Sequence, residues 1–200
     1  MIAGTVADAV VGPMSVEQWA RLPEDEPGEI VDGFLVEEEV PDNVHEIVLA
    51  WLLHCLHGWG RPRGAVVLGS GTKFAVAANR GRMPDISVFL AGAAKPPKRG
   101  LNRTPPSIAI EIVSPSPKDE RRDRVEKLRE YAAFGVRWYW IVDPELRSLQ
   151  IHELNADGRY EHAVDVTEGW VPAVPGCEGL SLDVSGLWSE IDALGEDGGA

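Results

Sequence analysis

Three residues whose side chains can do chemistry lie in or beside apolar stretches of this chain: Asp85, Glu111 and Lys127. Glu111 interrupts Ser107–Val113 (SIAIEIV), an apolar, β-branched run that is typical of a central strand buried on both faces. A carboxylate there must be paired, protonated or bound to a metal, because burying it bare is costly. Asp85 follows Pro84 and opens a second apolar run. We therefore expect two acids to meet at neighbouring strand ends.

Two carboxylates form an oxygen donor set, which suits Mg²⁺ or Mn²⁺ better than Zn²⁺. Magnesium keeps several waters, and one of them can become the nucleophile in phosphodiester hydrolysis. Lys127 lies on the helix expected after the Glu111 strand, where Asp123, Lys127 and Tyr131 share one face through their spacing of four. A lysine there could lean over the sheet edge, orient the water and stabilise developing charge. This pattern predicts a metal-dependent site of nuclease type.

Each of these residues also has a purely structural interpretation. Asp85 could cap a turn, and Glu111 could pair with an arginine. Asp123 and Lys127 could form an exposed helical ion pair that stabilises the helix by about 0.3–0.5 kcal/mol. Tyr131 could serve only in packing. The chemical interpretation gains weight when the acids and the lysine are considered together.

The elements that must position these side chains begin near the N-terminus. Ser15 and Gln18 have capping-box spacing and open a short helix. Residues 29–37 predict a hairpin around Asp32-Gly33. A long helix with one apolar stripe is expected from about Asn43 to His57, ended by Gly58 and Gly60.

The rest of the chain alternates strands and helices. Short strands are expected at 65–68, 73–77 and 85–90, with 79–82 as a turn cluster between the last two. A helix from about 119 to 134, ended by Gly135, follows the central strand, and then come a buried strand at 138–142 and a hairpin of 149–153 with 160–164. This order predicts an α/β fold, a mixed sheet flanked by helices. We expect a flexible leader at 1–13, one domain at 14–190 and an acidic, glycine-rich tail at 191–200.

Composition narrows the class of protein. The 200 residues include 19 basic and 32 acidic side chains, giving a net charge of −13. Such a charge disfavours a general nucleic-acid coat protein. Basic patches at 95–103 and 121–124 could offset it locally. The run Gly69–Lys73 (GSGTK) is expected to be a turn, because it lacks the spacing of a phosphate-binding loop.

Two isolated cysteines, Cys55 and Cys177, fit buried thiols in a reducing compartment. No signal peptide and no apolar run of about 20 residues is visible, so we expect a cytoplasmic protein.

Four motifs in this order carry a resemblance to a known family: PDISVF, IEIVSPSP, D-x-x-x-K-x-x-x-Y-x-x-x-GV and YWIVDP. Over about residues 14–188 the chain resembles the Uma-type endonuclease family of the PD-(D/E)xK superfamily. The resemblance implies a restriction-endonuclease-like fold with an αβββαβ core. It implies Asp85 and Glu111 as the two acids. In the standard motif the lysine lies two residues after the second acid, where this chain has Val113. The family's substitute on the following helix matches Lys127.

The resemblance also suggests Glu29 and His45 as accessory site residues, although either could instead be a solvent-facing polar side chain. Our leading hypothesis is a Mg²⁺- or Mn²⁺-dependent endonuclease acting on DNA, with Asp85 and Glu111 as metal ligands. We also expect a homodimer, because two-fold symmetry suits the cutting of two strands. One alternative is a nuclease-like fold that binds a partner without cleavage. Another is a metal hydrolase of a small phosphoester.

Overall fold

The computed structural model describes residues 13–23, 28–36, 41–114 and 122–195, with the backbone alone at Arg122. A six-stranded sheet forms its centre, in the order β10-β9-β8-β7-β6-β3. Its strands are β3 Val66–Leu68, β6 Ile86–Phe89, β7 Ile108–Ile112, β8 Trp138–Asp143, β9 Ser148–Leu154 and β10 Tyr160–Val166. The pair β7–β8 is parallel, and the other neighbouring strands run antiparallel. The predicted mixed α/β sheet is therefore confirmed.

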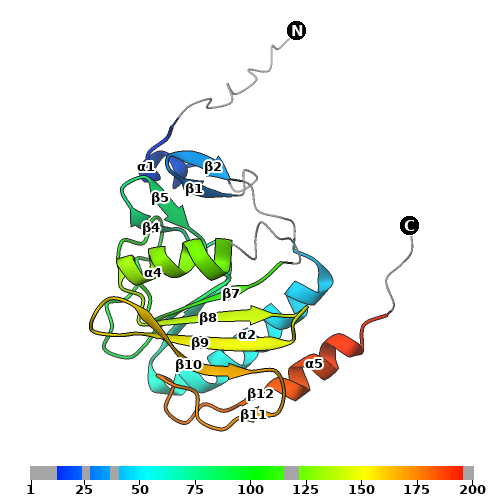
Figure 1. Ribbon diagram of the computed structural model, residues 1–200. Coiled ribbons are helices and arrows are strands. Elements are labelled where there is room, and N and C mark those ends of the chain that lie inside the picture. Colours follow the sequence, from blue (N-terminus) through cyan, green and yellow to red (C-terminus); the bar gives the residue numbers. More distant parts are fainter. Residues whose placement is uncertain (1–12, 24–27, 37–40, 115–121, 196–200) are drawn as a thin grey trace.

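Helices cover both faces of this sheet (Figure 1). The long helix α2, Asn43–Gly60, packs its apolar stripe on one face against alternate residues of β7, namely Ile108, Ile110 and Ile112. The other face carries Ala109 and Val113, which pack with Tyr131 of α4, Leu128–Phe134. Because side chains alternate along a strand, Glu111 must point to the α4 face. The strand is buried on both faces, as its apolar run predicts.

A smaller sheet, in the order β2-β1-β5-β4, lies beside α4. Its strands are β1 Glu29–Val31, β2 Phe34–Val36, β4 Phe74–Ala77 and β5 Arg80–Arg82. The hairpin predicted around Asp32-Gly33 is confirmed by the β1–β2 pairing. The prediction of a turn over 79–82 is wrong, because Arg80–Arg82 pairs with both β1 and β4. Turn propensity is a local signal, and long-range pairing outweighs it here.

A close approach explains the glycine in β5. The helix α1, Val16–Trp19, begins with the predicted capping box of Ser15 and Gln18. Its fully buried Trp19 lies against Gly81, where a Cβ atom would come within 2.3 Å of the indole. Only glycine leaves room for the ring, so Gly81 fixes how α1 packs on the smaller sheet.

One helix boundary differs from expectation, and another lies outside the described residues. α2 continues through Gly58 to Gly60, and the left-handed residue is Gly64, after the short 3-10 helix η1, Arg61–Arg63. Burial of Trp59 outweighs the cost of about 1 kcal/mol for a helical glycine. The helix predicted from 119 begins outside the described residues. Its described part is a π-helical turn, η2 Arg122–Lys127, followed by α4 and ended by Gly135 in the left-handed conformation.

The C-terminal part contains the short strands expected in an otherwise irregular segment through Trp188, and a helix that was not predicted. A two-stranded sheet of β11 Trp170–Val171 and β12 Leu182–Asp183 leads into helix α5, Val184–Asp192. Leu187 and Trp188 of α5 join the core on the α2 side. The helix therefore extends past residue 190, two residues into the predicted tail. Residues 1–12 of the predicted leader and 196–200 of the tail lie outside the described residues. Cys55 and Cys177 are free thiols, and none of the described helices is long and apolar enough to cross a membrane.

Candidate active site

Glu111 lies at the centre of a buried polar cluster on the α4 face of the main sheet. Only 2% of the residue is exposed. Lys127 Nζ lies 2.8 Å from its Oε2, and the Tyr131 hydroxyl donates to Oε1 at 2.6 Å. The charged partner of Glu111 is thus a lysine, not the arginine considered above. Tyr131 packs in the core and also fixes the carboxyl group.

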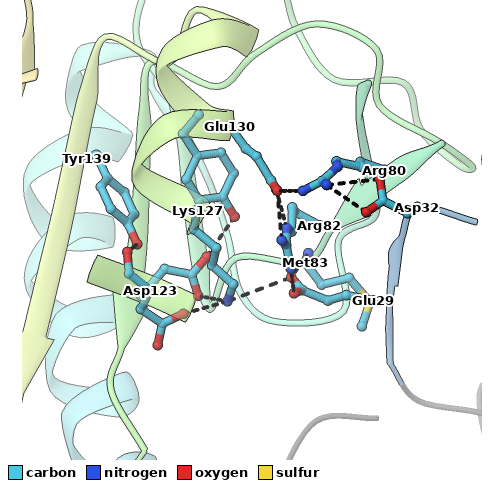
Figure 2. Close-up of polar contacts among 11 residues, drawn as sticks. Glu29, Asp32, Arg80, Arg82, Met83, Asp123, Lys127, Glu130 and Tyr139 are labelled. Atoms are coloured by element: carbon cyan, nitrogen blue, oxygen red, sulfur yellow. Dashed lines mark hydrogen bonds and ion pairs between the residues drawn. The ribbon is translucent and has the colours of Figure 1, made fainter. Parts of the chain in front are cut away.

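Lys127 connects several acids. Besides Glu111, its ammonium lies 3.0 Å from Asp123 Oδ1 and 3.7 Å from Glu29 Oε1 (Figure 2). Asp123 and Lys127 are 3% and 2% exposed, so the interpretation as an exposed helical ion pair is wrong. The Tyr139 hydroxyl also donates to the main-chain oxygen of Asp123 at 3.0 Å, which ties the π-helical turn to β8.

Asp85 lies next to Glu111 at the ends of two neighbouring strands. β6 and β7 pair Ile86 with Ile110, so Asp85, just before β6, lies at the same end of the two strands as Glu111. Asp85 Oδ2 accepts the N–H of Ile112 at 2.7 Å. This contact runs across the sheet, so Asp85 does not act as the local turn cap considered above.

His45 approaches Asp85 from the first turn of α2. Its Nε2 lies 3.2 Å from Asp85 Oδ1, and its main-chain N–H donates to the capping side chain of Asp42 at 2.8 Å. Burial alone would lower the pKa of His45, but the hydrogen bond and charge of Asp85 outweigh burial and raise it. The residue is 7% exposed, so it is not the solvent-facing histidine considered as an alternative.

Glu29 enters the cluster from β1 of the smaller sheet. It is fully buried and accepts the N–H of Met83 at 2.9 Å and a hydrogen bond from the guanidinium of Arg82. Burial alone would raise the pKa of Glu29, but the charges of Lys127 and Arg82 outweigh it and lower the pKa. The structure therefore gathers the five predicted site residues in two contacting groups. Lys127 joins Glu111 and Glu29, and His45 pairs with Asp85, whose carboxylate accepts the N–H of the residue after Glu111.

Sequence reasoning missed Arg82, which is fully buried between two acids. Its Nε and Nη2 donate to the two oxygens of Glu130 at 2.6 and 3.0 Å, while Nη1 reaches Glu29. Arg80 extends this network from Glu130 to Asp32 (Figure 2). An arginine in an expected turn carries no signal of burial. The burial of Arg82 follows from the pairing of Arg80–Arg82 with β1, and only a prediction of that pairing could have revealed it.

The pKa values of the two buried glutamates are shifted in opposite directions. Burial is the main reason that the pKa of Glu111 lies well above its ordinary value. Lys127 opposes that rise, and the negative charges of Asp123 and Asp85 add to it. Glu29 has the opposite shift. Two neighbouring carboxyl groups whose pKa values are pushed apart can hold different protonation states at one pH, which is a property of acid–base sites.

The residues present fit a divalent cation that prefers oxygen ligands. The Asp85 carboxylate accepts the N–H of the residue after Glu111, and the Asp85 side chain is 18% exposed, which opens this end of the strands toward solvent. A cation there would favour the ionised form of Glu111 that burial disfavours. Within the described ranges no group of three histidine, cysteine or acidic side chains is arranged to hold a metal. Two carboxylates are enough for Mg²⁺, which usually keeps several of its waters.

A mixed sheet flanked by helices, with acids on adjacent strands and a lysine on the crossover helix, defines a restriction-endonuclease-like nuclease fold. The chain belongs to the Uma2 family, described as "Putative restriction endonuclease", whose model matches residues 15–185. The expected family is confirmed.

A solved structure shares the fold. It is described as a putative nuclease belonging to DUF820 from Anabaena variabilis ATCC 29413, with a TM-score of 0.70 and 21% sequence identity. The match covers 88% of this chain and 98% of that one. No curated protein matches. Family and fold together support a nuclease function.

Proposed function

We propose that this protein is a metal-dependent endonuclease that hydrolyses phosphodiester bonds in DNA. The observation that carries the proposal is the meeting of Asp85, Glu111 and Lys127 from three consecutive elements in one cluster. Asp85 and Glu111 would hold Mg²⁺ or Mn²⁺ at this end of β6 and β7. When bound, such a cation supplies Lewis acidity toward a phosphoryl oxygen and a water of lowered pKa.

The chain's own residues then have distinct tasks. Lys127 places a positive charge beside Glu111, where it can orient a water and stabilise negative charge that develops on phosphate oxygens. His45 holds Asp85 through Oδ1 and leaves that carboxylate fixed on the sheet edge. Glu29 and Asp123 flank the Lys127 ammonium and favour its charged form. Burial of the cluster strengthens each of these interactions because bulk water is excluded.

Calorimetric titration of Mg²⁺ and Mn²⁺ into the wild type and Glu111→Gln tests the metal site. We expect binding to the wild type that is lost in the variant. Glu161→Gln is the matched control, because Glu161 is an exposed glutamate on β10, away from the cluster. Cleavage of supercoiled plasmid by the same proteins, and by Asp85→Ala, tests the activity. Unchanged metal binding and cleavage in both Asp85→Ala and Glu111→Gln would refute the site.

The same assays separate the alternatives. DNA binding without cleavage at any metal concentration would favour a non-catalytic binding module, for which the net charge of −13 is the specific motivation. Turnover of bis(p-nitrophenyl) phosphate without any action on plasmid would favour a small phosphoester as substrate.

We further propose that the chain from residue 14 to the end of α5 at Asp192 folds as one domain, two residues longer than expected from the sequence, and that the enzyme works in the cytoplasm as a homodimer. A two-fold axis would present two sites to opposite strands. Light scattering on the eluting peak of a size-exclusion column tests the dimer, and a monomer mass across the micromolar range would refute it.

A further inference from the structure

A second polar feature lies near the carboxylate cluster: an open cavity of about 790 Å³. Its walls come from the end of α1, the turn at 68–73, Met83 and the basic loop at 97–102. The turn and the loop are the GSGTK run and the basic patch seen in the sequence. The turn does not form a phosphate-binding loop before a helix, since β4 follows it. It nevertheless contributes Ser70, Thr72 and Lys73 to the cavity wall.

The charge of the cavity is opposite to that of the chain. Lys73, Lys98 and Arg99 line it, and no acidic residue of the described segments does. For a chain of net charge −13, this wall is an unusual concentration of positive charge. Lys98 and Arg99 are exposed, so their cationic groups remain free to move onto a ligand. The described wall therefore favours anions, against the long-range field of the rest of the molecule.

The cationic wall is held in place by main-chain contacts. Lys73 Nζ donates to the Trp19 carbonyl at 3.0 Å and lies over the indole ring. The N–H of Asn102 donates to the Lys73 carbonyl at 2.9 Å, and the Asn102 carbonyl accepts from Ala75 at 2.8 Å. The Asn102 side chain adds a further bond to the Lys73 carbonyl at 3.1 Å. These bonds fix one end of the basic loop to β4, three residues from Arg99.

The cavity and the carboxylate cluster share a short piece of chain. Met83 lines the cavity, and its main-chain N–H donates to Glu29 Oε1. Asp85 follows two residues later, so the Cα atoms of Met83 and Asp85 are at most about 7.6 Å apart. A strand whose phosphodiester lies at Asp85 and Glu111 therefore has a neighbouring cationic surface within a few nucleotides.

We infer that this cavity binds the sugar–phosphate backbone of the nucleic-acid strand that is cleaved at the carboxylate cluster. The inference rests on the proposed endonuclease function. Lys98 and Arg99 would contact phosphate oxygens, with Lys73 supplying fixed charge at the wall. Leu22, Leu68 and Met83 add an apolar surface on which a sugar or an unstacked base can pack. A small carboxylate would leave most of a cavity this large unused.

The test measures binding of a fluorescein-labelled single-stranded oligonucleotide by fluorescence anisotropy. EDTA removes divalent metal, so that binding is measured without cleavage. Lys98→Ala/Arg99→Ala is compared with Arg61→Ala/Arg159→Ala, which removes the same charge from two exposed arginines outside the cavity. We expect the cavity variant to bind at least tenfold more weakly. The slope of log affinity against log salt should fall by about 1.4, because about 0.7 ions are released per phosphate contact on a single strand. The control should keep the wild-type slope.

In the binding assay, the inference would be overturned by no binding to the wild type, by equal losses in the two variants, or by no loss in the cavity variant. Plasmid cleavage in Mg²⁺ is measured separately on the same proteins. Cleavage with an unaffected cavity variant would reject the cavity and keep the proposed function, whereas cavity-dependent binding without any cleavage would reject the endonuclease and keep the binding site. A mononucleotide that binds as tightly as the oligonucleotide would overturn the assignment to a strand.

Discussion

Lys127 Nζ lies 2.8 Å from Glu111 Oε2, and both side chains are 3% exposed. The cation and the carboxylate therefore meet away from bulk water, where each charge is stabilised by the other. An ion pair of this kind is costly to break, because removing one partner leaves an uncompensated buried charge. Since Lys127 also contacts Asp123 and Glu29, one side chain offsets the charge of several acids.

Replacing Lys127 by methionine should lower the free energy of unfolding by about 3–5 kcal/mol at pH 8. Without the cation, Glu111 can avoid the unpaired charge only by taking up a proton, so the deficit should be smaller at pH 5. Urea denaturation at the two pH values measures both effects. Lys95→Met is the control, because Lys95 is exposed on the basic loop and should change stability little. An equal deficit at both pH values would contradict the role of Glu111.

Metal binding should release a proton from Glu111. Burial raises the pKa of this carboxyl above its ordinary value of 4.5, so the group keeps its proton at a higher pH than a free glutamate does. A bound cation must displace that proton. Metal affinity should then increase with pH until the group is fully ionised. Calorimetry in two buffers with different ionisation enthalpies measures the released protons. Metal binding to the wild type with no proton release, or with an affinity that does not change with pH, would contradict this role of Glu111.

The His45–Asp85 contact should stabilise the fold more at low pH. The contact raises the pKa of His45 above its ordinary 6.5 in the folded state, despite burial. The stabilisation is therefore fully present below pH 6.5 and is lost as pH rises through the folded-state pKa. His45→Gln should lower the free energy of unfolding by about 1.5 kcal/mol or more at pH 5.5, with a smaller loss at pH 9. His57→Gln on the exposed side of α2 is the control. A loss independent of pH would exclude the charged contact.

Two glycine-to-alanine variants should have effects of opposite sign. At Gly81 a Cβ atom would meet the Trp19 ring at 2.3 Å, so Gly81→Ala should destabilise the protein by about 1–3 kcal/mol through overpacking. At Gly58, inside α2, a Cβ atom would meet nothing within 4 Å. Gly58→Ala should stabilise it by about 0.5–1 kcal/mol. Thermal unfolding of the two variants beside the wild type checks both, and a stable Gly81→Ala would refute the close packing.

Much of the main sheet was predictable because its strands have strong local signals. The run around Glu111 is almost continuously apolar, and a buried parallel strand requires such a run. The same run made its one acid conspicuous. Lys127 could be predicted as well, since the helix after that strand must cross over the sheet and the spacing of Asp123, Lys127 and Tyr131 puts the lysine on one helix face with them.

The smaller sheet and its arginines were not predictable in this way. Arg80–Arg82 has the local composition of a turn, and its pairing with β1 joins residues about 50 positions apart. Arg82 is buried only as a result of that pairing. Helix α5 was missed because its apolar side chains pack against the core around α2, which lies more than 100 residues earlier in the sequence. Both errors arise where long-range contacts outweigh local preference.

The crossover between β7 and β8 also governs the order of assembly. These are parallel neighbours, so the chain must travel the length of the sheet between Ile112 and Trp138, and Lys127 lies on that return path. Closing such a connection costs chain entropy before the contacts between the two strands form and stabilise it. A nascent chain that stops short of Trp138 would carry both acids and the lysine without the strand that holds them together. The cluster is thus built to mature only after synthesis has passed β8.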